Sequence, residues 1–121
     1  MKIIFLQTGG GLVEHAPIFE SEAQLRAWLP AHAASCYCGE FMGGKKRTPA
    51  ERMTAFLEDY EMPDTPNGRW AAAVAWAVDK GRSEWAIGTR ECDHVDAEGR
   101  AISPQATFIH LNEEYAASVA P

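Results

Sequence analysis

The nine residues 70–78 constrain the fold more than any other segment, because they can be read either as a strand or as a helix. The large side chains Trp70, Val74, Trp76 and Val78 occupy even positions, and positions 71, 73, 75 and 77 are alanine. A strand would place these two sets on opposite faces, whereas a helical stripe leaves Trp76 off the apolar face, although alanine favours helices. We therefore predict a strand over 70–78.

The segments that follow indicate two further strands. Residues 79–82 form a short glycine-containing turn before a strand over 83–91, and residues 96–100 form a second turn before a strand over 106–111. Strands joined by short glycine-containing turns usually pair as antiparallel hairpins. The second half of the chain therefore predicts a three-stranded antiparallel meander.

The first half begins with one strand and one helix. Residues 2–7 are rich in β-branched and aromatic side chains and run into glycines, which indicates a buried strand that ends at a turn. Ser21 begins a helix over about 21–34, whose apolar stripe is interrupted at Pro30. Residues 35–47 show no apolar period and contain three glycines, so we expect a loop or a short extended piece there.

A second helix has the clearest start signal in the sequence. Thr48 is the expected N-cap, Pro49 occupies the first helical position, and Glu51 can reach back to the cap. This helix should end near Tyr60, because prolines follow at positions 63 and 66.

Together these elements predict an α+β fold with an N-terminal strand, two helices, and then a three-stranded antiparallel meander packed against the helices. A length of 121 residues suits a single globular domain over 1–121. The last residues, about eight of them, are expected to fray or to add a short final turn.

Charge and hydropathy exclude several functional classes. The 17 acidic and 11 basic residues leave a formal net charge of −6, which argues against a general binder of nucleic acid or membrane surfaces. No apolar run approaches the roughly 20 residues that span a bilayer. We expect a cytoplasmic protein, and its alanine-rich composition suggests a bacterial or bacteriophage source.

All three cysteines lie in close pairs, which makes zinc a candidate cofactor. Cys36 and Cys38 form one pair, and Cys92 with His94 forms the other. In extended segments, residues two apart point to the same side, so the four side chains could supply a structural zinc site. The same residues could equally be small core side chains, with His94 on a solvated turn.

Two features could contact a protein partner. Lys45, Lys46 and Arg47 form a cationic cluster just before the second helix, where an acidic partner or a phosphate could bind. If 70–78 is a strand, Ala73 and Ala75 belong to a flat face of small side chains that another protein or a second copy could cover.

No catalytic signature is present. A cysteine, a histidine and an acid could form a nucleophilic site, but these residue types occur in most chains of this length. We therefore expect a small accessory protein of bacterial or phage origin that acts by binding another protein, for example as an inhibitor of a host defence complex. The alternative is a zinc-binding domain or zinc-dependent enzyme that uses Cys36, Cys38, Cys92 and His94.

Overall fold

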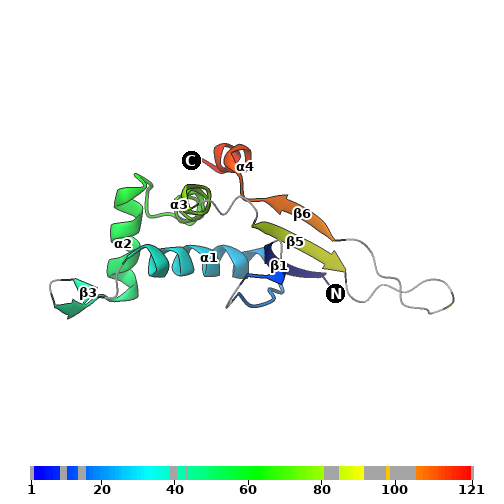
Figure 1. Cartoon of the computed structure of the whole chain (residues 1–121), viewed down its shortest axis with the longest axis horizontal. Coiled ribbons are helices and arrows are strands. Elements are labelled where there is room, and N and C mark those ends of the chain that lie inside the picture. Colours follow the sequence, from blue (N-terminus) through cyan, green and yellow to red (C-terminus); the bar gives the residue numbers. More distant parts are fainter. Residues whose placement is uncertain are drawn as a thin grey trace.

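The computed structural model of the chain describes residues 2–8, 11–13, 16–38, 41–42, 44–80, 85–91, 98 and 106–120. Its elements are, in chain order, β1 (Lys2–Thr8), β2 (Gly11–Leu12), α1 (Glu22–Tyr37), β3 (Phe41–Met42), β4 (Lys45–Lys46), α2 (Pro49–Asp59), α3 (Pro66–Asp79), β5 (Ala86–Glu91), β6 (Thr107–His110) and α4 (Glu113–Val119). Figure 1 shows the larger sheet near one end of α1 and α2 at the other, with α1, α3 and α4 stacked in that order. The predicted α+β class is confirmed.

The larger sheet is antiparallel and has the strand order β2-β1-β5-β6. Leu6 of β1 lies opposite Ile87 of β5, which in turn lies opposite Ile109 of β6. The strands expected at 2–7, within 83–91 and within 106–111 are therefore present. The first strand of the chain, β1, lies inside the sheet between β2 and β5. Its side chains Ile4 and Leu6 are buried in the core.

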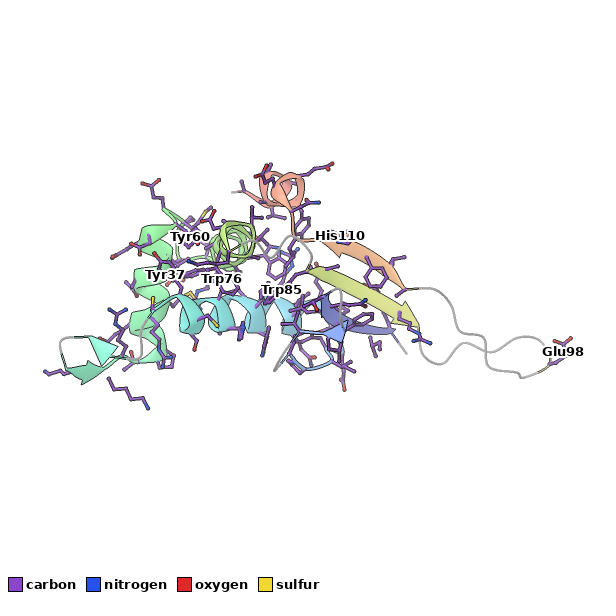
Figure 2. The ribbon with its side chains drawn as sticks, viewed as in Figure 1. Tyr37, Tyr60, Trp76, Trp85, Glu98 and His110 are labelled. Atoms are coloured by element: carbon purple, nitrogen blue, oxygen red, sulfur yellow. The ribbon has the colours of Figure 1, made fainter. Side chains whose placement is uncertain are left out.

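The predicted strand over 70–78 is wrong, because this segment belongs to α3. Thr65 caps the helix by accepting the backbone N–H of Gly68 at 2.9 Å, and Pro66 occupies the first turn. The helix is buried on several sides, so it needs no single apolar stripe. Trp70 donates its indole N–H to Tyr115 of α4 at 3.2 Å. Trp76, which a single stripe would leave exposed, lies beside Trp85 with ring centroids 6.1 Å apart (Figure 2).

The predicted three-stranded meander is therefore also wrong in its detail. With 70–78 helical, β5 pairs with β1 on one side and with β6 on the other. The long-range pairing between β1 and β5 replaces the local hairpin that the turn at 79–82 suggested.

The segment 35–47, predicted to be a loop or a short extended piece, begins with the last turn of α1 and contains two short paired strands. Helix α1 passes through Pro30 and ends at Tyr37, and β3 pairs with β4 as a two-stranded hairpin. Pro30 removes one backbone hydrogen bond from α1, but the ring is fully buried and packs in the core. The burial of α1 therefore outweighs the tendency of Pro30 to end the helix.

The second predicted helix is confirmed as α2, which ends one residue before Tyr60. The tail forms α4, capped by the side chain of Asn112, and Tyr115 of this helix packs against the core. Across the described part of the chain, no helix is long and apolar enough to cross a membrane.

Candidate functional site

Ala73 and Ala75, predicted to lie on a flat contact face, do not share an exposed surface. Both are on α3, where residues two apart point in different directions. Ala73 is fully buried, while Ala75 is partly exposed. The alternation behind the predicted alanine face is absent, and we do not propose these residues as contacts.

Cys36 and Cys38 also point apart. Cys36 lies within α1 and is exposed, so the extended segment that would align the two thiols is not present. Cys38 caps the helix, is buried, and donates its thiol hydrogen to the backbone carbonyl of Arg52 at 3.3 Å. Cys92 and His94 lie outside the described residues.

No group of three or more metal-ligating side chains is found among the residues that the structure describes. The four-residue zinc site therefore stays a prediction.

The predicted basic cluster lies on β4 and immediately before α2. Lys45 and Lys46 are exposed, and Arg47 is partly buried. The backbone carbonyl of Arg47 accepts a long hydrogen bond of 3.5 Å from the guanidinium of Arg52. The cluster is thereby connected to the first turns of α2.

The N-terminus of α2 already binds a carboxylate of its own. Glu51 accepts the backbone N–H of Thr48 at 3.1 Å, and the hydroxyl of Thr48 accepts the backbone N–H of Glu51 at 3.1 Å. These hydrogen bonds, with a smaller contribution from Arg47, hold the pKa of Glu51 below its usual value. The cap therefore reduces what this helix end can offer to an external phosphate.

This cap predicts a measurable acid sensitivity. Because the folded-state pKa of Glu51 is lowered, its contribution to stability is present above the unfolded value of about 4.3 and is lost as pH falls through the folded value. The Glu51→Gln variant should show a shallower fall in the free energy of unfolding at acidic pH. Thr48→Ala should lower that free energy by about 1 kcal/mol near neutral pH.

Urea unfolding at a series of pH values measures both effects. Thr54→Ala is the matched control, because Thr54 lies on the same helix and its hydroxyl binds only the carbonyl of Ala50 within the described residues. An acid limb that is equally steep in wild type and Glu51→Gln would show that the cap is not coupled to folding.

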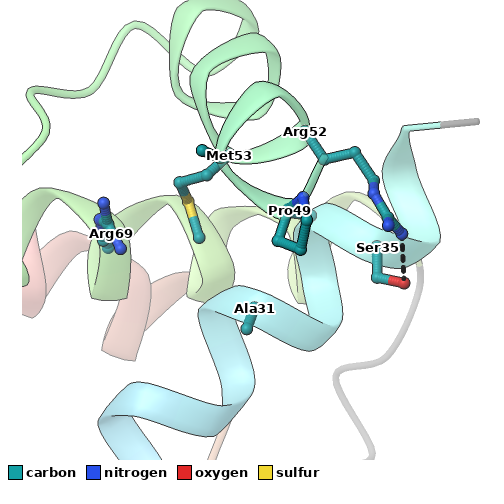
Figure 3. A pocket seen from close by; sticks show the side chains of 8 residues that line it. Ala31, Ser35, Pro49, Arg52, Met53 and Arg69 are labelled. Carbon is teal, nitrogen blue, oxygen red and sulfur yellow. Dashed lines mark hydrogen bonds between the residues drawn. The ribbon is translucent and has the colours of Figure 1, made fainter. Parts of the chain in front are cut away.

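A cavity of about 440 Å³ lies between α1 and α2. Its lining comprises Ala31, Ala34, Ser35, Pro49, Ala50, Arg52, Met53 and Arg69. Figure 3 shows Arg69 at one end and Arg52 at the other, where a guanidinium nitrogen donates to the Ser35 hydroxyl at 3.4 Å. The floor is made of small side chains and the two ends carry positive charge.

A second cavity of about 650 Å³ continues along α1 toward its N-terminus. It is lined by Ala23, Arg26, Ala27, Asp64, Thr65, Pro66, Asn67 and Arg69. Arg69 lines both cavities, so they adjoin at this residue. We call the two cavities together the α1 groove.

The charged side chains of the α1 groove are mostly arginines. Arg26, Arg52 and Arg69 line it together with one carboxylate, Asp64. Asp64 accepts a hydrogen bond of 2.7 Å from Arg69, and this bond lowers the pKa of the carboxyl group. The lining therefore carries net positive charge on a chain whose formal net charge is −6.

Of the three arginines that line the α1 groove, Arg52 makes the longest side-chain hydrogen bonds within the described residues. Its terminal nitrogens make contacts of 3.4 and 3.5 Å, near the outer limit for a hydrogen bond. Its Nε is buried and has no hydrogen-bond partner within the described residues. The terminal nitrogens can therefore donate stronger, charge-assisted hydrogen bonds to a carboxylate ligand.

Arg26 lines the second cavity, so Arg69 lies between it and Arg52 in the groove. Its guanidinium lies 4.9 Å from the centre of the Trp70 ring and forms an ion pair of 3.0 Å with Glu22. The contact with Trp70 and the ion pair hold the Arg26 guanidinium in place.

The sequence analysis did not identify these three arginines as a set. They are separated by 26 and 17 positions in sequence, and only the packing of α2 and α3 against α1 brings them together. One feature of the sequence could have indicated the floor of the groove. Alanine occurs at positions 23, 27 and 31, and this four-residue spacing places the three alanines on one face of α1.

No family model matches this sequence, and comparisons with curated proteins and with solved structures found no match either.

Proposed function

We propose that this protein acts by binding another protein, and that the α1 groove holds an acidic helix of that partner. One observation carries the proposal: three arginines and a single aspartate line a concave surface on a chain of net charge −6. Like charges elsewhere on the chain repel an acidic partner, so a positive groove favours one orientation of approach.

The shape of the groove suits a helix. The lining residues of α1 extend from Ala23 to Ser35, and at about 1.5 Å per residue they span roughly 18 Å, or about three helical turns. Ala23, Ala27 and Ala31 are exposed, and their small side chains allow a second helix to approach α1 closely. Apolar residues of such a helix would pack on these alanines, as in other helix-in-groove complexes.

The flanking charges define the chemistry of the partner. Arg52 at one end makes only long hydrogen bonds within the chain and can bind a carboxylate of the partner. Arg26 at the other end is already paired with Glu22, and Arg69 between them is paired with Asp64. Lys45 and Lys46 are exposed on β4 and precede Arg47, whose backbone carbonyl accepts the hydrogen bond from Arg52. An amphipathic helix with glutamates or aspartates beside its apolar face would satisfy this arrangement.

The narrower expectation of a bacterial or phage inhibitor of a host defence complex rests on the small size and acidity of the chain. It specifies the biological setting of the same binding activity, and it stays a prediction.

A pair of synthetic peptides tests the charge preference. Both are amphipathic helices with the same alanine and leucine face, and one is flanked by glutamates and the other by lysines. We expect the acidic peptide to bind, to shift the amide signals of Ala23, Ala27 and Ala31 in NMR spectra, and to bind more weakly as salt rises. Failure of the acidic peptide to bind, or equal binding of both peptides, would contradict the proposal.

Variants locate the binding surface. Ala31→Glu adds bulk and negative charge to the exposed floor, and Arg52→Glu reverses the charge at one end; each should weaken binding about tenfold or more. Arg90→Glu is the charge control, because Arg90 is an exposed arginine on β5 that does not line the groove. Phe108→Ser is the apolar control, because Phe108 of β6 is 44% exposed. Loss of binding in either control would place the interface on the sheet.

The basic cluster has a separate kinetic role in this proposal. Replacing Lys45, Lys46 and Arg47 together by glutamate should slow association and flatten its salt dependence, with little change in stability. Association rates that are unchanged at every salt concentration would exclude the cluster from the interface.

A further inference from the structure

We propose that β6 binds an extended, lysine- or arginine-containing segment of another protein, which adds to the sheet as a further strand. β6 lies at one end of the strand order β2-β1-β5-β6, so β5 pairs with one side of it and no described strand pairs with the other. Figure 1 shows β6 at the outer side of the sheet, close to α4. The proposal is independent of the proposed function, because no residue of β6 or α4 lines the α1 groove.

The backbone of β6 directs hydrogen-bonding groups at the open edge. In an antiparallel pair, residues that bond to the neighbouring strand alternate with residues whose backbone groups point away from it. The backbone N–H of Leu111 donates to the carbonyl of Trp85 at 2.8 Å, which sets this alternation along the register of β5 and β6. Ile109 therefore bonds to β5, whereas Phe108 and His110 direct their N–H and C=O groups outward.

Three of these four outward groups have no hydrogen-bond partner among the described residues. The exception is the carbonyl of His110, which accepts the N–H of Asn112 at 3.0 Å. Edge strands of natural proteins are commonly protected by lysines, prolines or bulges. β6 has the sequence Thr-Phe-Ile-His and pairs with β5 in unbroken register, so it contains none of the three. A strand from another molecule can therefore pair with it.

A cavity beside β6 can hold one side chain of the added strand. Its volume is about 280 Å³, and its lining comprises Ile109, His110, Asn112, Glu114, Tyr115 and Ser118. Ile109 lies opposite the buried residue Ile87, so its side chain is on the core face of the sheet, yet it is 50% exposed. A residue of the added strand that lies beside Ile109 has its side chain on the same face. An apolar side chain there would enter the cavity and cover Ile109.

The charge beside the cavity indicates the chemistry of the partner. Glu114 is exposed and lines the cavity, and no lysine or arginine is among the described residues of the lining. A lysine or arginine of the added strand would pair with Glu114, and the net charge of −6 would attract it from a distance. A second copy of this chain would add its own β6, which contains no lysine or arginine. The charges therefore favour a different, basic protein as the partner.

Two short synthetic peptides test this preference. In both, threonine alternates with valine around a central isoleucine, and one flanking position on the isoleucine face is lysine in the first peptide and glutamate in the second. We expect the lysine peptide to bind about fivefold or more tightly than the glutamate peptide, and more weakly as salt rises. It should shift the amide signals of Phe108, His110 and Ser118 in NMR spectra. The signal of Ala31 should not move, and Ala31→Glu should leave the affinity unchanged, because Ala31 belongs to the α1 groove.

Variants at the edge separate strand pairing from side-chain contacts. His110→Pro removes one outward N–H and keeps the hydrogen bonds to β5, so it should weaken peptide binding about tenfold or more in a folded protein. His110→Ala is the matched control, because it retains the N–H and should bind nearly as wild type. Glu114→Lys should abolish the preference for the lysine peptide. Glu113→Lys should retain it, because Glu113 does not line the cavity.

Methylated peptides give the same test without altering the protein. If the central isoleucine lies beside Ile109, its two neighbours bond to Phe108 and His110. Methylation of the backbone nitrogens of those neighbours should abolish binding, whereas methylation of the isoleucine nitrogen should preserve it.

Several results would overturn the proposal. They are failure of the lysine peptide to bind, equal binding of the lysine and glutamate peptides, and equal binding of the two methylated peptides. Sedimentation velocity tests for a second copy at the edge. Wild-type dimers that His110→Pro dissociates and His110→Ala retains would assign β6 to self-association and would also overturn the proposal.

Discussion

Replacing Ala73 by glutamate is expected to unfold the protein. The methyl group of Ala73 is completely buried on α3 within the core, so a longer side chain must displace packed neighbours and its carboxylate would be removed from solvent. Overpacking and burial of an unpaired charge together should cost about 4 kcal/mol or more. That loss is a large part of the 5–15 kcal/mol by which domains of this size are usually stable.

Ala75→Glu is the matched control for this prediction. Ala75 lies on the same helix, two residues away, but it is partly exposed. A glutamate there can direct its carboxylate to solvent, so we expect a change of about 1 kcal/mol or less. Urea unfolding followed by tryptophan fluorescence compares the two variants, and equal stability of both would contradict the buried position of Ala73.

Gly68→Ala is expected to be the second strongly destabilising change. Alanine is normally the better helix former, by about 1 kcal/mol. Here an added Cβ would overlap the backbone carbonyl oxygen of Pro63 and lie 3.0 Å from the Cγ of the proline ring. Because the obstacle is backbone, the turn before α3 must move, and we expect a net loss of about 3 kcal/mol.

Asn67→Ala is the control for Gly68→Ala. Asn67 is the neighbouring residue in the first turn of α3 and is exposed, so its replacement should change stability by about 0.5 kcal/mol at most. Thermal unfolding measures both variants. A Gly68→Ala protein as stable as wild type would show that helix propensity outweighs the contact with Pro63.

The comparison between α2 and α3 shows where sequence reasoning succeeds. The start of α2 was predictable because Thr48, Pro49 and Glu51 all act within one turn, and the structure contains the same capping box. The end of the helix near Tyr60 was also predictable, since local backbone chemistry determines it.

The prediction for α3 failed because it assumed that one face of the element would be exposed. Alternating large and small residues favour a strand only if the two faces have different environments. Trp70 contacts α4, while Trp76 contacts Trp85 before β5, so large side chains on different sides of the helix are all buried. The local sequence does not show how many other helices and strands will pack against an element.

The candidate sites also differ in whether the sequence or only the packing of the helices reveals them. Lys45, Lys46 and Arg47 are adjacent in the chain, so their charge cluster is visible in the sequence. Arg26, Arg52 and Arg69 become one surface only when three helices pack together. Likewise, β6 becomes an edge of the sheet because β1 pairs with the other side of β5.

The sequence by itself therefore determined the features that arise within a few residues: the helix caps, the first strand, the overall α+β class and the basic cluster. Tertiary structure decided that residues 70–78 are helical, that β1 pairs with β5, and that three arginines line one groove. The physical reason is that burial depends on contacts between residues far apart in the chain. The apolar area removed from water can outweigh local backbone preferences of about 1 kcal/mol or less per residue.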